Sequence, residues 1–537
     1  MTHDRAAVRT VLDAVLARGN GALTPAEAKR VCDAYGIDMP QEGLARSAEE
    51  AVSLALGIGF PVALKIVSPD ILHKTEAGGV VTGVESAEAV AAAYDRIIGS
   101  AKAYLPTAQI AGVQVQQMLP QALEVIVGAT TDPSFGKIVA FGLGGVLVEV
   151  LKDATFRLAP LTDDDALSML DGIQAAEMLR GVRGSDPVDR AALATLIRNV
   201  SELVADFPEI GEMDLNPVLA RKDGATAVDV RIIVDPAAAK VRQRYSTEEI
   251  LTAMNRIMRP NAVAVIGASA EDGKIGNSVM KNLINGGYQG AIYPVNPRAD
   301  EILGKKCYAS VLDIPGEVDV AVFAIPAKLV AQGLAEVGQK KIPGAVLIPS
   351  GFAETGNVEG QQEIVDVARQ YGVRFMGPNI YGFYYTPKNL CATFCTPYDV
   401  KGSVALASQS GGIGMAILGF ARSTKMGVSA IVGVGNKADI DEDDLLTFFE
   451  QDDATQCVAL HMEDLKDGRA FVEVAKRVSQ KKPIVVLKAG RTAMGARAAS
   501  SHTAALAGDD KVYDDMLRQA GVVRADGLRD MLEFARC

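Results

Sequence analysis

The chain contains only four histidines, and two of them lie in loops built from small residues. His73 lies in the segment SPDILHKTEAGGV, and His502 lies in ASSHTAALAG. A histidine beside glycines in a loop can act as a nucleophile or as a proton carrier, although a surface histidine without a chemical role gives the same pattern. His461 lies in an apolar, strand-like run instead, so we expect it to pack in a core.

Carboxylates accompany the histidines in the second half of the chain. Glu463 ends the apolar run CVALHME, at the carboxyl edge where parallel sheets bind their ligands. A glutamate at that edge can orient an imidazole by accepting its second N–H. The acidic run DEDD at 441–444 is expected to be the solvated start of a helix, where acidic side chains complement the helix dipole.

Three oxygen-bearing residues, Asp214, Asn216 and Asp229, lie on a predicted hairpin. Asp214 and Asn216 are two residues apart on one strand, so both side chains face the same way, and Asp229 lies on the paired strand. Carboxylate and amide oxygens suit Mg²⁺, which also takes ligands from a substrate phosphate. A solvated hairpin face explains the same spacing, so the pattern alone leaves both interpretations open.

Two glycine-rich loops each follow an apolar run and precede a helical one. The loop GASAEDGK at 267–274 has five residues between its glycines, and Ile275 stands where a Walker A motif needs Ser or Thr, so it is not that motif. It still offers backbone N–H groups to a phosphate, as does SQSGGIG at 408–414. Ser410 is not a nucleophile elbow, because Ser408 stands where the first glycine of that motif belongs.

The helices and strands expected to position these residues follow different patterns in the first and the later parts of the chain. Capping-box signals predict helices over 22–60, and a hairpin is predicted from 212–220 and 226–234, which together favour an α+β unit. The segment 234–250 is charged and is typical of a linker. Later, all-apolar runs alternate with helical stretches, which is typical of buried parallel sheets. The expected strands lie at 61–67, 124–131 and 136–145, then at 262–269, 290–297, 318–326, 344–352 and 373–379, and finally at 403–409, 428–436, 457–463 and 482–490.

Composition excludes several classes of protein. The 537 residues carry a net charge of −12, which argues against binding to a nucleic-acid backbone. No signal peptide is visible in residues 1–21, and the uncharged stretch 402–421 contains five glycines, so we predict no membrane span. The six cysteines show neither disulfide-framework nor zinc spacing, which favours a cytoplasmic location.

Long stretches of the chain resemble three domains of one family. Residues 1–245 resemble an ATP-grasp domain, through VALKIVSPDILHKTEAGGVVTGV, EVIVGATTDPSFGKIVAFGLGGVLVEVLKD and EMDLNPV. Residues 246–388 resemble the Rossmann-like CoA-binding domain of succinyl-CoA synthetase-like enzymes, through VIGAS, YPVNPR, PSGFAE and MGPN. Residues 389–537 resemble their flavodoxin-like ligase domain, through SQSGGIGMAI, VGNKADIDEDDLL, KAGRT and SSHTAALAG. The chain is thus similar to the nucleoside-diphosphate-forming acyl-CoA synthetases, which are α/β multidomain proteins.

The resemblance implies a mechanism. The γ-phosphoryl of ATP passes through a phosphohistidine to a carboxylic acid, and the CoA thiol then attacks the acyl phosphate. His502 matches the phosphorylated residue, His73 matches a second histidine on a swinging loop, and Glu463 matches the glutamate that supports His502. The binding residues implied are, for ATP, Lys65, Glu124, Gly144 and Gly145; for Mg²⁺, Asp214, Asn216 and Asp229; for the phosphate loop, Ser410, Gly411 and Gly412; and for CoA, Gly267, Ser269, Asn296, Pro297, Arg298, Ser350 and Asn379.

The sequence departs from the family pattern at three places. The family has a further flavodoxin-like domain where this chain ends, so we expect either a truncated chain or a homo-oligomer or partner chain that supplies that domain. Ala504 replaces a glycine after His502, which reduces the freedom of the loop. The family's GPN-Cys-Leu-Gly reads GPNIYGFYY here, and its aromatic residues are expected to line an acyl pocket, with core packing as the alternative. They are Tyr381, Phe383, Tyr384 and Tyr385.

We therefore expect an acid–thiol ligase that joins a carboxylic acid to CoA, with ATP and Mg²⁺, and that favours an aromatic acid such as ferulate. A ligase for a short acid such as acetate or succinate is the alternative. A non-catalytic CoA- or nucleotide-binding protein is a rival from another class. A nicotinamide dehydrogenase built on 262–385 is a second rival, but it leaves both loop histidines unexplained.

Overall fold

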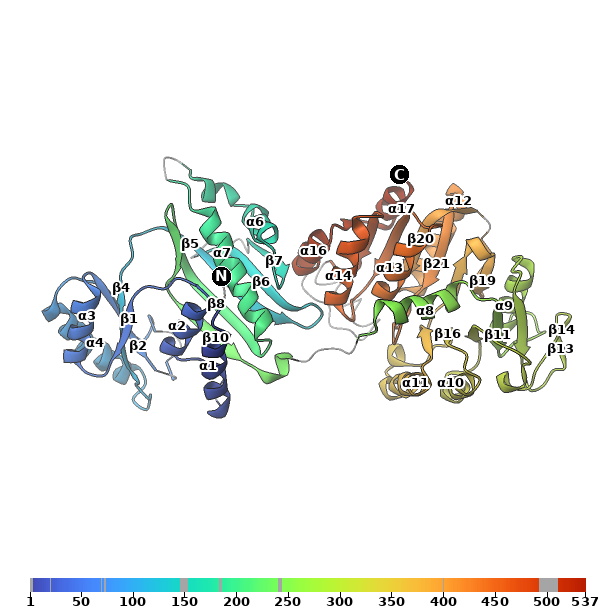
Figure 1. The fold of residues 1–537 in the computed structure, drawn as a ribbon, viewed down its shortest axis with the longest axis horizontal. Coiled ribbons are helices and arrows are strands. Elements are labelled where there is room, and N and C mark those ends of the chain that lie inside the picture. Colours follow the sequence, from blue (N-terminus) through green and yellow to red (C-terminus); the bar gives the residue numbers. More distant parts are fainter. Residues whose placement is uncertain are drawn as a thin grey trace. The chain divides into compact units, whose positions relative to one another are not determined.

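The fold is described from a computed structural model, which divides into two compact units (Figure 1). We call Met1–Lys240 the N-terminal unit and Val241–Cys537 the C-terminal unit. Among the helices of the residues described, none is both long and apolar enough to cross a membrane. The structure describes residues 3–19, 21–68, 70–71, 74–144, 153–182, 186–239, 244–398, 400–491 and 510–537.

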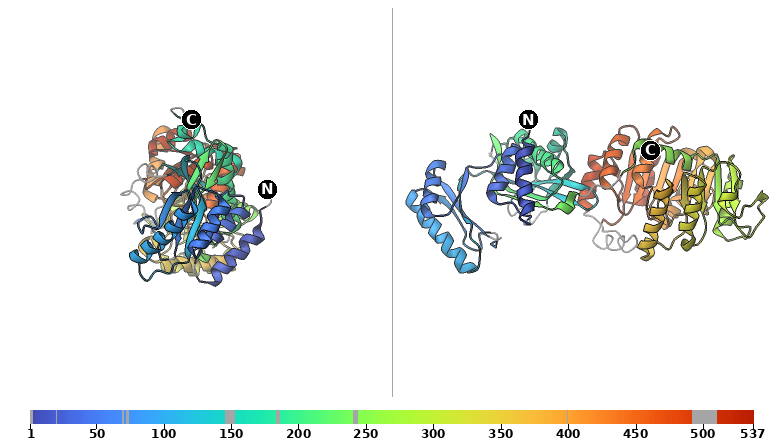
Figure 2. Two further views of the ribbon diagram at one scale, coloured as in Figure 1. Left: turned by 90° about the vertical axis from the view of Figure 1, so that its left-hand side faces the viewer. Right: turned by 60° about the horizontal axis from the view of Figure 1, so that its bottom comes forward.

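A small antiparallel sheet in the N-terminal unit has the order β1-β4-β2-β3. Two helices, α3 and α4, pack together against it (Figure 2). Each helix starts at a serine cap, Ser47 for α3 and Ser86 for α4. The cap of α3 lies in the region where capping signals predict helices, whereas α4 was not predicted. The strand β1 interrupts a region predicted to be helical throughout. The elements are β1 (Glu42–Ala45), α3 (Ala48–Ile58), β2 (Val62–Val67), β3 (Val80–Val84), α4 (Ala87–Tyr104) and β4 (Gly112–Gln117).

A larger sheet in the same unit has the order β10-β8-β5-β6-β7, with β9 paired to β8. The predicted hairpin is confirmed, because β9 and β10 both pair antiparallel with β8. Helices α1, α2 and α7 share one apolar core with this sheet. The elements are α1 (Arg5–Ala17), α2 (Pro25–Ala34), β5 (Leu123–Asp132), β6 (Gly136–Leu143), β7 (Ala154–Leu158), α6 (Asp163–Gly172), η1 (Ala176–Arg180), α7 (Arg190–Asp206), β8 (Ile210–Arg221), β9 (Gly224–Ala227), β10 (Val230–Val234) and η2 (Pro236–Ala239).

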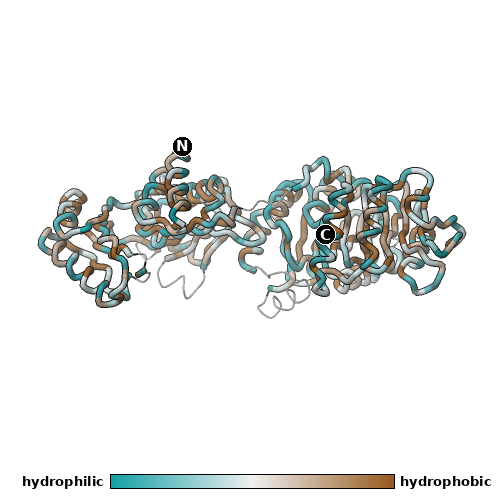
Figure 3. The backbone as a smooth tube through the Cα atoms, turned by 90° about the horizontal axis from the view of Figure 1, so that it is seen from below, coloured by the Kyte–Doolittle hydropathy of each residue, from teal (hydrophilic) through white to brown (hydrophobic). Residues whose placement is uncertain are grey.

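The C-terminal unit begins with a parallel five-stranded sheet of order β12-β11-β15-β16-β17. Its central strands are buried along their whole length, as the all-apolar runs predict. Hydrophobic residues recur along the backbone of this unit (Figure 3). The elements are α8 (Thr247–Met258), β11 (Ala262–Ile266), α9 (Ile275–Asn285), β12 (Ala291–Val295), β13 (Glu301–Ile302), β14 (Lys305–Lys306), η3 (Val311–Asp313), β15 (Val320–Phe323), η4 (Ala327–Leu329), α10 (Val330–Gln339), β16 (Gly344–Leu347), η5 (Ala353–Thr355), α11 (Val358–Tyr371) and β17 (Arg374–Met376).

A second sheet of this unit has the order β19-β18-β21-β20-β22-β23-β24. The strands from β20 to β24 are parallel, whereas β18 and β19 are antiparallel additions at one edge. The elements are β18 (Gly382–Tyr385), η6 (Thr386–Lys388), β19 (Leu390–Thr393), β20 (Lys401–Ser408), α12 (Gly411–Thr424), β21 (Val428–Gly433), α13 (Glu442–Gln451), β22 (Cys457–Met462), α14 (Gly468–Ser479), β23 (Ile484–Lys488), α16 (Asp510–Gln519), β24 (Val523–Arg524) and α17 (Leu528–Arg536).

The aromatic stretch forms β18 and the residue before it, and it therefore belongs to the second sheet. Phe383, Tyr384 and Tyr385 are buried, with 0%, 1% and 2% of their surface exposed. The Tyr384 hydroxyl donates to the Thr396 carbonyl oxygen at 2.6 Å, and that of Tyr385 donates to Asp452 at 2.8 Å. Tyr381 is also buried, at 5% exposed. The expectation that these rings line an acyl pocket is wrong, and the core-packing alternative is confirmed.

Candidate active site

Lys65 lies on β2 and is held by a glutamine on the neighbouring strand β4. The Lys65 ammonium donates to Gln116 Oε1 at 2.8 Å, and Gln116 Nε2 donates to Glu42 at 2.7 Å and to the Val228 carbonyl oxygen at 3.0 Å. Burial lowers the pKa of Lys65, and the charge of Lys74 acts in the same direction. Gln116 thus ties the small sheet to the segment that precedes β10. Sequence reasoning missed it, because a glutamine in a strand is typical of a solvent-facing position.

Asp214 and Asn216 lie on β8, and Asp229 lies directly before β10. The Asn216 N–H donates to the Asp229 carbonyl oxygen at 3.1 Å, and Lys74 Nζ lies 3.7 Å from Asp229 Oδ2. Burial raises the pKa of Asp214, and the carboxylates of Glu212 and Asp229 add to the rise. A divalent cation would relieve that repulsion, so the donor set fits Mg²⁺. Within the described ranges, no group of three His, Cys, Asp or Glu residues is placed to hold a metal by itself.

Glu124 and Gly144 lie side by side where β5 begins and β6 has just ended. The Gly144 N–H donates to the Glu124 carbonyl oxygen at 2.8 Å. A Cβ atom on Gly144 would lie 3.0 Å from the carbonyl carbon of Glu124, so the close approach favours glycine here. The Glu124 side chain is exposed, as a nucleotide ligand requires. Gly145 lies outside the described residues.

The residues expected to bind CoA lie after strands of the first parallel sheet, at its carboxyl edge. Gly267 has a φ of +88°, and a Cβ atom there would lie 2.5 Å from the Ala324 carbonyl oxygen. Asn296 Nδ2 donates to the Ala268 carbonyl oxygen at 2.8 Å, which joins the loops after β11 and β12. The residues at this edge are Gly267, Ser269, Asn296, Pro297, Arg298, Ser350 and Asn379.

Asn379 also connects the two sheets of the C-terminal unit. Its Nδ2 donates to Asn436 Oδ1 at 3.3 Å, and Asn436 follows β21 of the second sheet. Asn436 Nδ2 in turn donates to Glu354 and, at 2.9 Å, to Gln361. The carboxyl edges of the two sheets therefore meet through side-chain amides. Sequence reasoning missed Asn436, although it ends an apolar strand-like run.

The phosphate loop after β20 opens helix α12. Ser410 is the N-cap residue, and its carbonyl oxygen accepts from the Ser408 hydroxyl at 2.8 Å. Gly411 and Gly412 are exposed, and apart from their chain neighbours and their own helix backbone, no atom of the described residues lies within 4 Å of a Cβ atom built on either. The first turn of α12 thus has room for an anion beside its backbone N–H groups.

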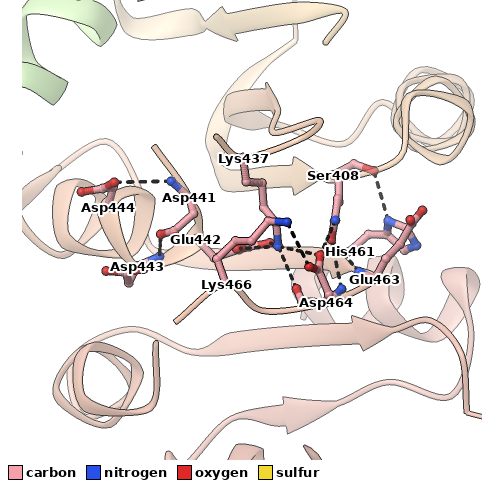
Figure 4. A network of polar contacts seen from close by, with 11 residues as sticks. Ser408, Lys437, Asp441, Glu442, Asp443, Asp444, His461, Glu463, Asp464 and Lys466 are labelled. Carbon is pink, nitrogen blue, oxygen red and sulfur yellow. Dashed lines mark hydrogen bonds and ion pairs between the residues drawn. The ribbon is translucent and has the colours of Figure 1, made fainter. Parts of the chain in front are cut away.

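Glu463 directly follows β22 (Figure 4). It is 9% exposed. It lines a pocket of about 30 Å³, which is room for roughly two water molecules. The pocket is lined by residues that follow strands of both sheets, so the expectation that Glu463 lies at a ligand-binding edge agrees with its position. The lining residues are Ala353, Gln361, Asn379, Gln409, Gly435, Asn436, Glu463 and Lys466.

The acidic run at 441–444 is partly buried, so the expectation of a solvated helix start is wrong for two of its members. Asp441 does cap α13, but Glu442 and Asp444 are 2% and 5% exposed. Glu442 accepts from the buried Lys437 ammonium at 3.0 Å, and Asp444 accepts from Arg374 at 2.9 Å. Glu442 and Asp444 are buried because they pair with two buried cations, Lys437 and Arg374.

His461 packs in the core, as predicted. It is 5% exposed, and its Nδ1 lies 3.2 Å from Ser408 Oγ. Burial, together with the nearby charge of Lys488, lowers the pKa of His461 to about 4. This histidine is therefore neutral at physiological pH. The two loop histidines, His73 and His502, lie outside the described residues.

Comparison with known proteins assigns a family to each part of the chain. Residues 14–234 match the ATP-grasp domain, 261–386 match a CoA binding domain, and 401–537 match the succinyl-CoA ligase like flavodoxin domain. An ADP-forming acetate–CoA ligase II from Archaeoglobus fulgidus is 40% identical over 516 residues, which is 95% of this chain and 74% of that relative. The chain belongs to the ADP-forming acyl-CoA synthetase family.

Other members of this family are similar to about half of the chain. Subunit alpha of an ADP-forming acetate–CoA ligase I from Pyrococcus furiosus is 52% identical over 290 residues, which is 53% of this chain and 63% of that subunit. An acetyl-coenzyme A synthetase 1 from Ca. Korarchaeum cryptofilum, solved with phosphate and ADP, is 44% identical. The match covers 52% of this chain and 61% of the synthetase chain, with a TM-score of 0.52. The chain thus spans roughly three fifths to three quarters of these relatives.

Proposed function

We propose that this chain is an acid–thiol ligase that forms acyl-CoA, ADP and phosphate from a carboxylic acid, CoA and ATP. Membership of the synthetase family supports this function. The structural observation that carries it is the pocket shared by the carboxyl edges of the two sheets. Asn379, expected to bind CoA, and Glu463, expected to support the phosphorylated histidine, both line that pocket.

The reaction would proceed in three balanced steps. An imidazole nitrogen of His502 attacks the γ-phosphorus of ATP, and ADP leaves. The acid's carboxylate then attacks the phosphorus of the phosphohistidine, which gives an acyl phosphate and free imidazole. The CoA thiolate attacks the acyl carbon, and phosphate leaves. The acyl phosphate is needed because a thiolate cannot displace oxide from a carboxylate, whereas phosphate is a good leaving group.

The N-terminal unit would bind and orient the nucleotide. Lys65, with Glu124 and the glycines at 144 and 145, would hold ATP. Asp214, Asn216 and Asp229 would hold Mg²⁺, which when bound neutralises phosphate charge. His73 would act as the second carrier, on the loop that moves the phosphoryl group.

A short aliphatic acid is the substrate that we propose, in place of an aromatic one. The aromatic side chains of β18 are in the core, so they supply no wall for a ring. The pocket beside Glu463 has a volume of about 30 Å³, which suits the carboxylate end of a small acid. The relatives described above carry the names of acetate–CoA ligases.

A substrate series tests the function. The chain is incubated with ATP, Mg²⁺, CoA and one of acetate, succinate, benzoate or ferulate, and ADP release and thiol loss are followed together. We expect equal amounts of ADP and thioester, fastest with acetate. A clear preference for ferulate would contradict the short-acid proposal. Binding of CoA and ATP without ADP release would favour the non-catalytic rival, and tight NADH binding would favour the dehydrogenase.

A further inference from the structure

Gln409 connects the ends of two neighbouring strands of the second sheet. It follows β20 and is 6% exposed. Its side-chain oxygen accepts from the N–H of Glu463 at 2.8 Å and from the N–H of Asp464 at 3.2 Å. Its side-chain nitrogen donates to the Asp464 carboxylate. One buried amide therefore fixes both residues that follow β22.

Asp464 is itself held in place by two lysines (Figure 4). Lys437 Nζ lies 3.1 Å from Asp464 Oδ1 and donates to the Asp464 carbonyl oxygen at 2.8 Å, while Lys466 Nζ lies 3.5 Å from Oδ2. Burial alone would raise the pKa of Asp464, but Lys437, Lys466 and Gln409 outweigh it and lower the pKa to about 2. Asp464 is therefore an anion throughout the physiological range.

The buried ammonium of Lys437 holds Asp464 in this position. Lys437 is 3% exposed, and its ammonium is also bound by both carboxylate oxygens of Glu442, at 3.0 and 3.2 Å. Burial would lower the pKa of Lys437, but Glu442 and Asp464 outweigh it and raise the pKa. A buried ammonium with two carboxylate partners has a fixed geometry, because moving any one of them leaves a buried charge unpaired.

We propose that Gln409 is a positioning residue that transmits this fixed geometry to the Glu463 carboxylate. The inference rests on the proposed function, in which Glu463 supports the imidazole of His502. A carboxylate performs that task only within hydrogen-bond reach of the ring, and a displacement of about 1 Å can lower a rate roughly a hundredfold. Gln409 holds the backbone N–H of Glu463 directly, whereas Lys437 acts through Asp464, which is the next residue in the chain and also binds Gln409.

A double-mutant cycle separates positioning from a merely structural role. The rate of protein phosphorylation by ATP is measured in single turnover for the wild type, Gln409→Met, Glu463→Gln and the double variant. Met keeps the length of the side chain and removes its hydrogen bonds. We expect Gln409→Met to slow phosphorylation about 10- to 100-fold in the wild-type background, and less than about twofold in the Glu463→Gln background. ATP affinity should stay within about twofold, and the exposed Gln480→Met is the matched control.

The other outcomes overturn the inference in distinguishable ways. If Gln409→Met slows phosphorylation by the same factor in the wild-type and Glu463→Gln backgrounds, Gln409 acts independently of Glu463. The positioning role is then wrong, while the proposed function stands. If Glu463→Gln leaves the rate unchanged, the role of Glu463 in the proposed function is wrong and the inference fails with it. Should Gln409→Met unfold, Gln409→Leu, which also removes the hydrogen bonds to the N–H groups of Glu463 and Asp464, is used in the same cycle with the same criteria.

Discussion

Arg374 binds Asp439 through a two-point contact, with Nε lying 3.0 Å from Oδ1 and 2.9 Å from Oδ2. Arg374 begins β17 of the first sheet, whereas Asp439 lies between β21 and α13 of the second. Arg374 Nη2 also lies 2.9 Å from Asp444, and the Tyr245 ring covers the guanidinium, with its centroid 3.8 Å from Cζ. This buried cation therefore links the sheets whose carboxyl edges form the candidate active site.

Removing that cation should destabilise the C-terminal unit. In Arg374→Met, the buried carboxylates of Asp439 and Asp444 lose their partner, which should cost about 3–5 kcal/mol in the free energy of unfolding. Lys281→Met is the matched control, because the pair Lys281–Asp272 is exposed and should contribute about 0–1 kcal/mol. Urea unfolding of the full chain measures both. An Arg374→Met effect as small as that of the control would contradict this account of the link.

Stability should depend on pH through His461. Its pKa is lowered to about 4 in the folded chain, so between that value and the ordinary pKa of about 6.5 only the unfolded chain binds the proton. The free energy of unfolding should therefore fall by about 3 kcal/mol in all as the pH falls from about 6.5 towards 4. Above about pH 6.5 this loss is absent. In His461→Asn, whose amide N–H can still donate to Ser408, this part of the slope should vanish. Equal slopes of unfolding free energy against pH in the two proteins would count against a neutral, buried His461.

Lys65→Met should weaken nucleotide binding. The partly buried ammonium of Lys65 is a charged hydrogen-bond donor expected to face a phosphate, and such bonds contribute about 1.5–3 kcal/mol. Calorimetric titration with ATP and Mg²⁺ should therefore show a dissociation constant roughly tenfold to a hundredfold higher. Lys102→Met, on the exposed side of α4, should bind ATP as the wild type does. Unchanged affinity in Lys65→Met would place the ATP site elsewhere.

Asp214→Asn should raise the Mg²⁺ requirement. The substitution removes one of two neighbouring carboxylates whose mutual repulsion a divalent cation relieves, so half-maximal phosphorylation by ATP should need at least about tenfold more Mg²⁺. Asp223→Asn, in the turn of the same hairpin, is the control and should leave the requirement unchanged. If both variants respond alike to Mg²⁺, the hairpin face is merely solvated, as the alternative interpretation holds.

The fold was largely predictable because its signals are local. The run AVAVI of β11 is apolar throughout and lies in a parallel sheet, and the hairpin predicted from 212–220 and 226–234 begins with the pairing of β8 and β9. The aromatic strand β18 was misread because a ligand pocket and a core require the same side chains. Its burial follows from pairing with β21, and that partner lies more than forty residues away in the sequence.

Residues of the candidate site were predictable from the sequence only where they follow the end of an apolar, strand-like run. Glu463 and Asn379 both follow apolar runs, and the structure brings both to one pocket. The burial of Glu442 and Asp444 was not predictable from the acidic run alone, because it depends on Lys437 and on the distant Arg374. A lone lysine directly after an apolar strand was the signal that could have revealed the buried cation.

The central claim is the phosphohistidine relay, and labelling with γ-³²P-ATP tests it most directly. The wild type, His502→Ala and Glu463→Gln are incubated with labelled ATP and Mg²⁺, and the protein-bound label is tested for stability in acid and base. The account predicts acid-labile, base-stable label in the wild type, none in His502→Ala, and slower labelling in Glu463→Gln. Equal labelling of the wild type and His502→Ala, or ATP binding by the wild type without any label, would contradict it.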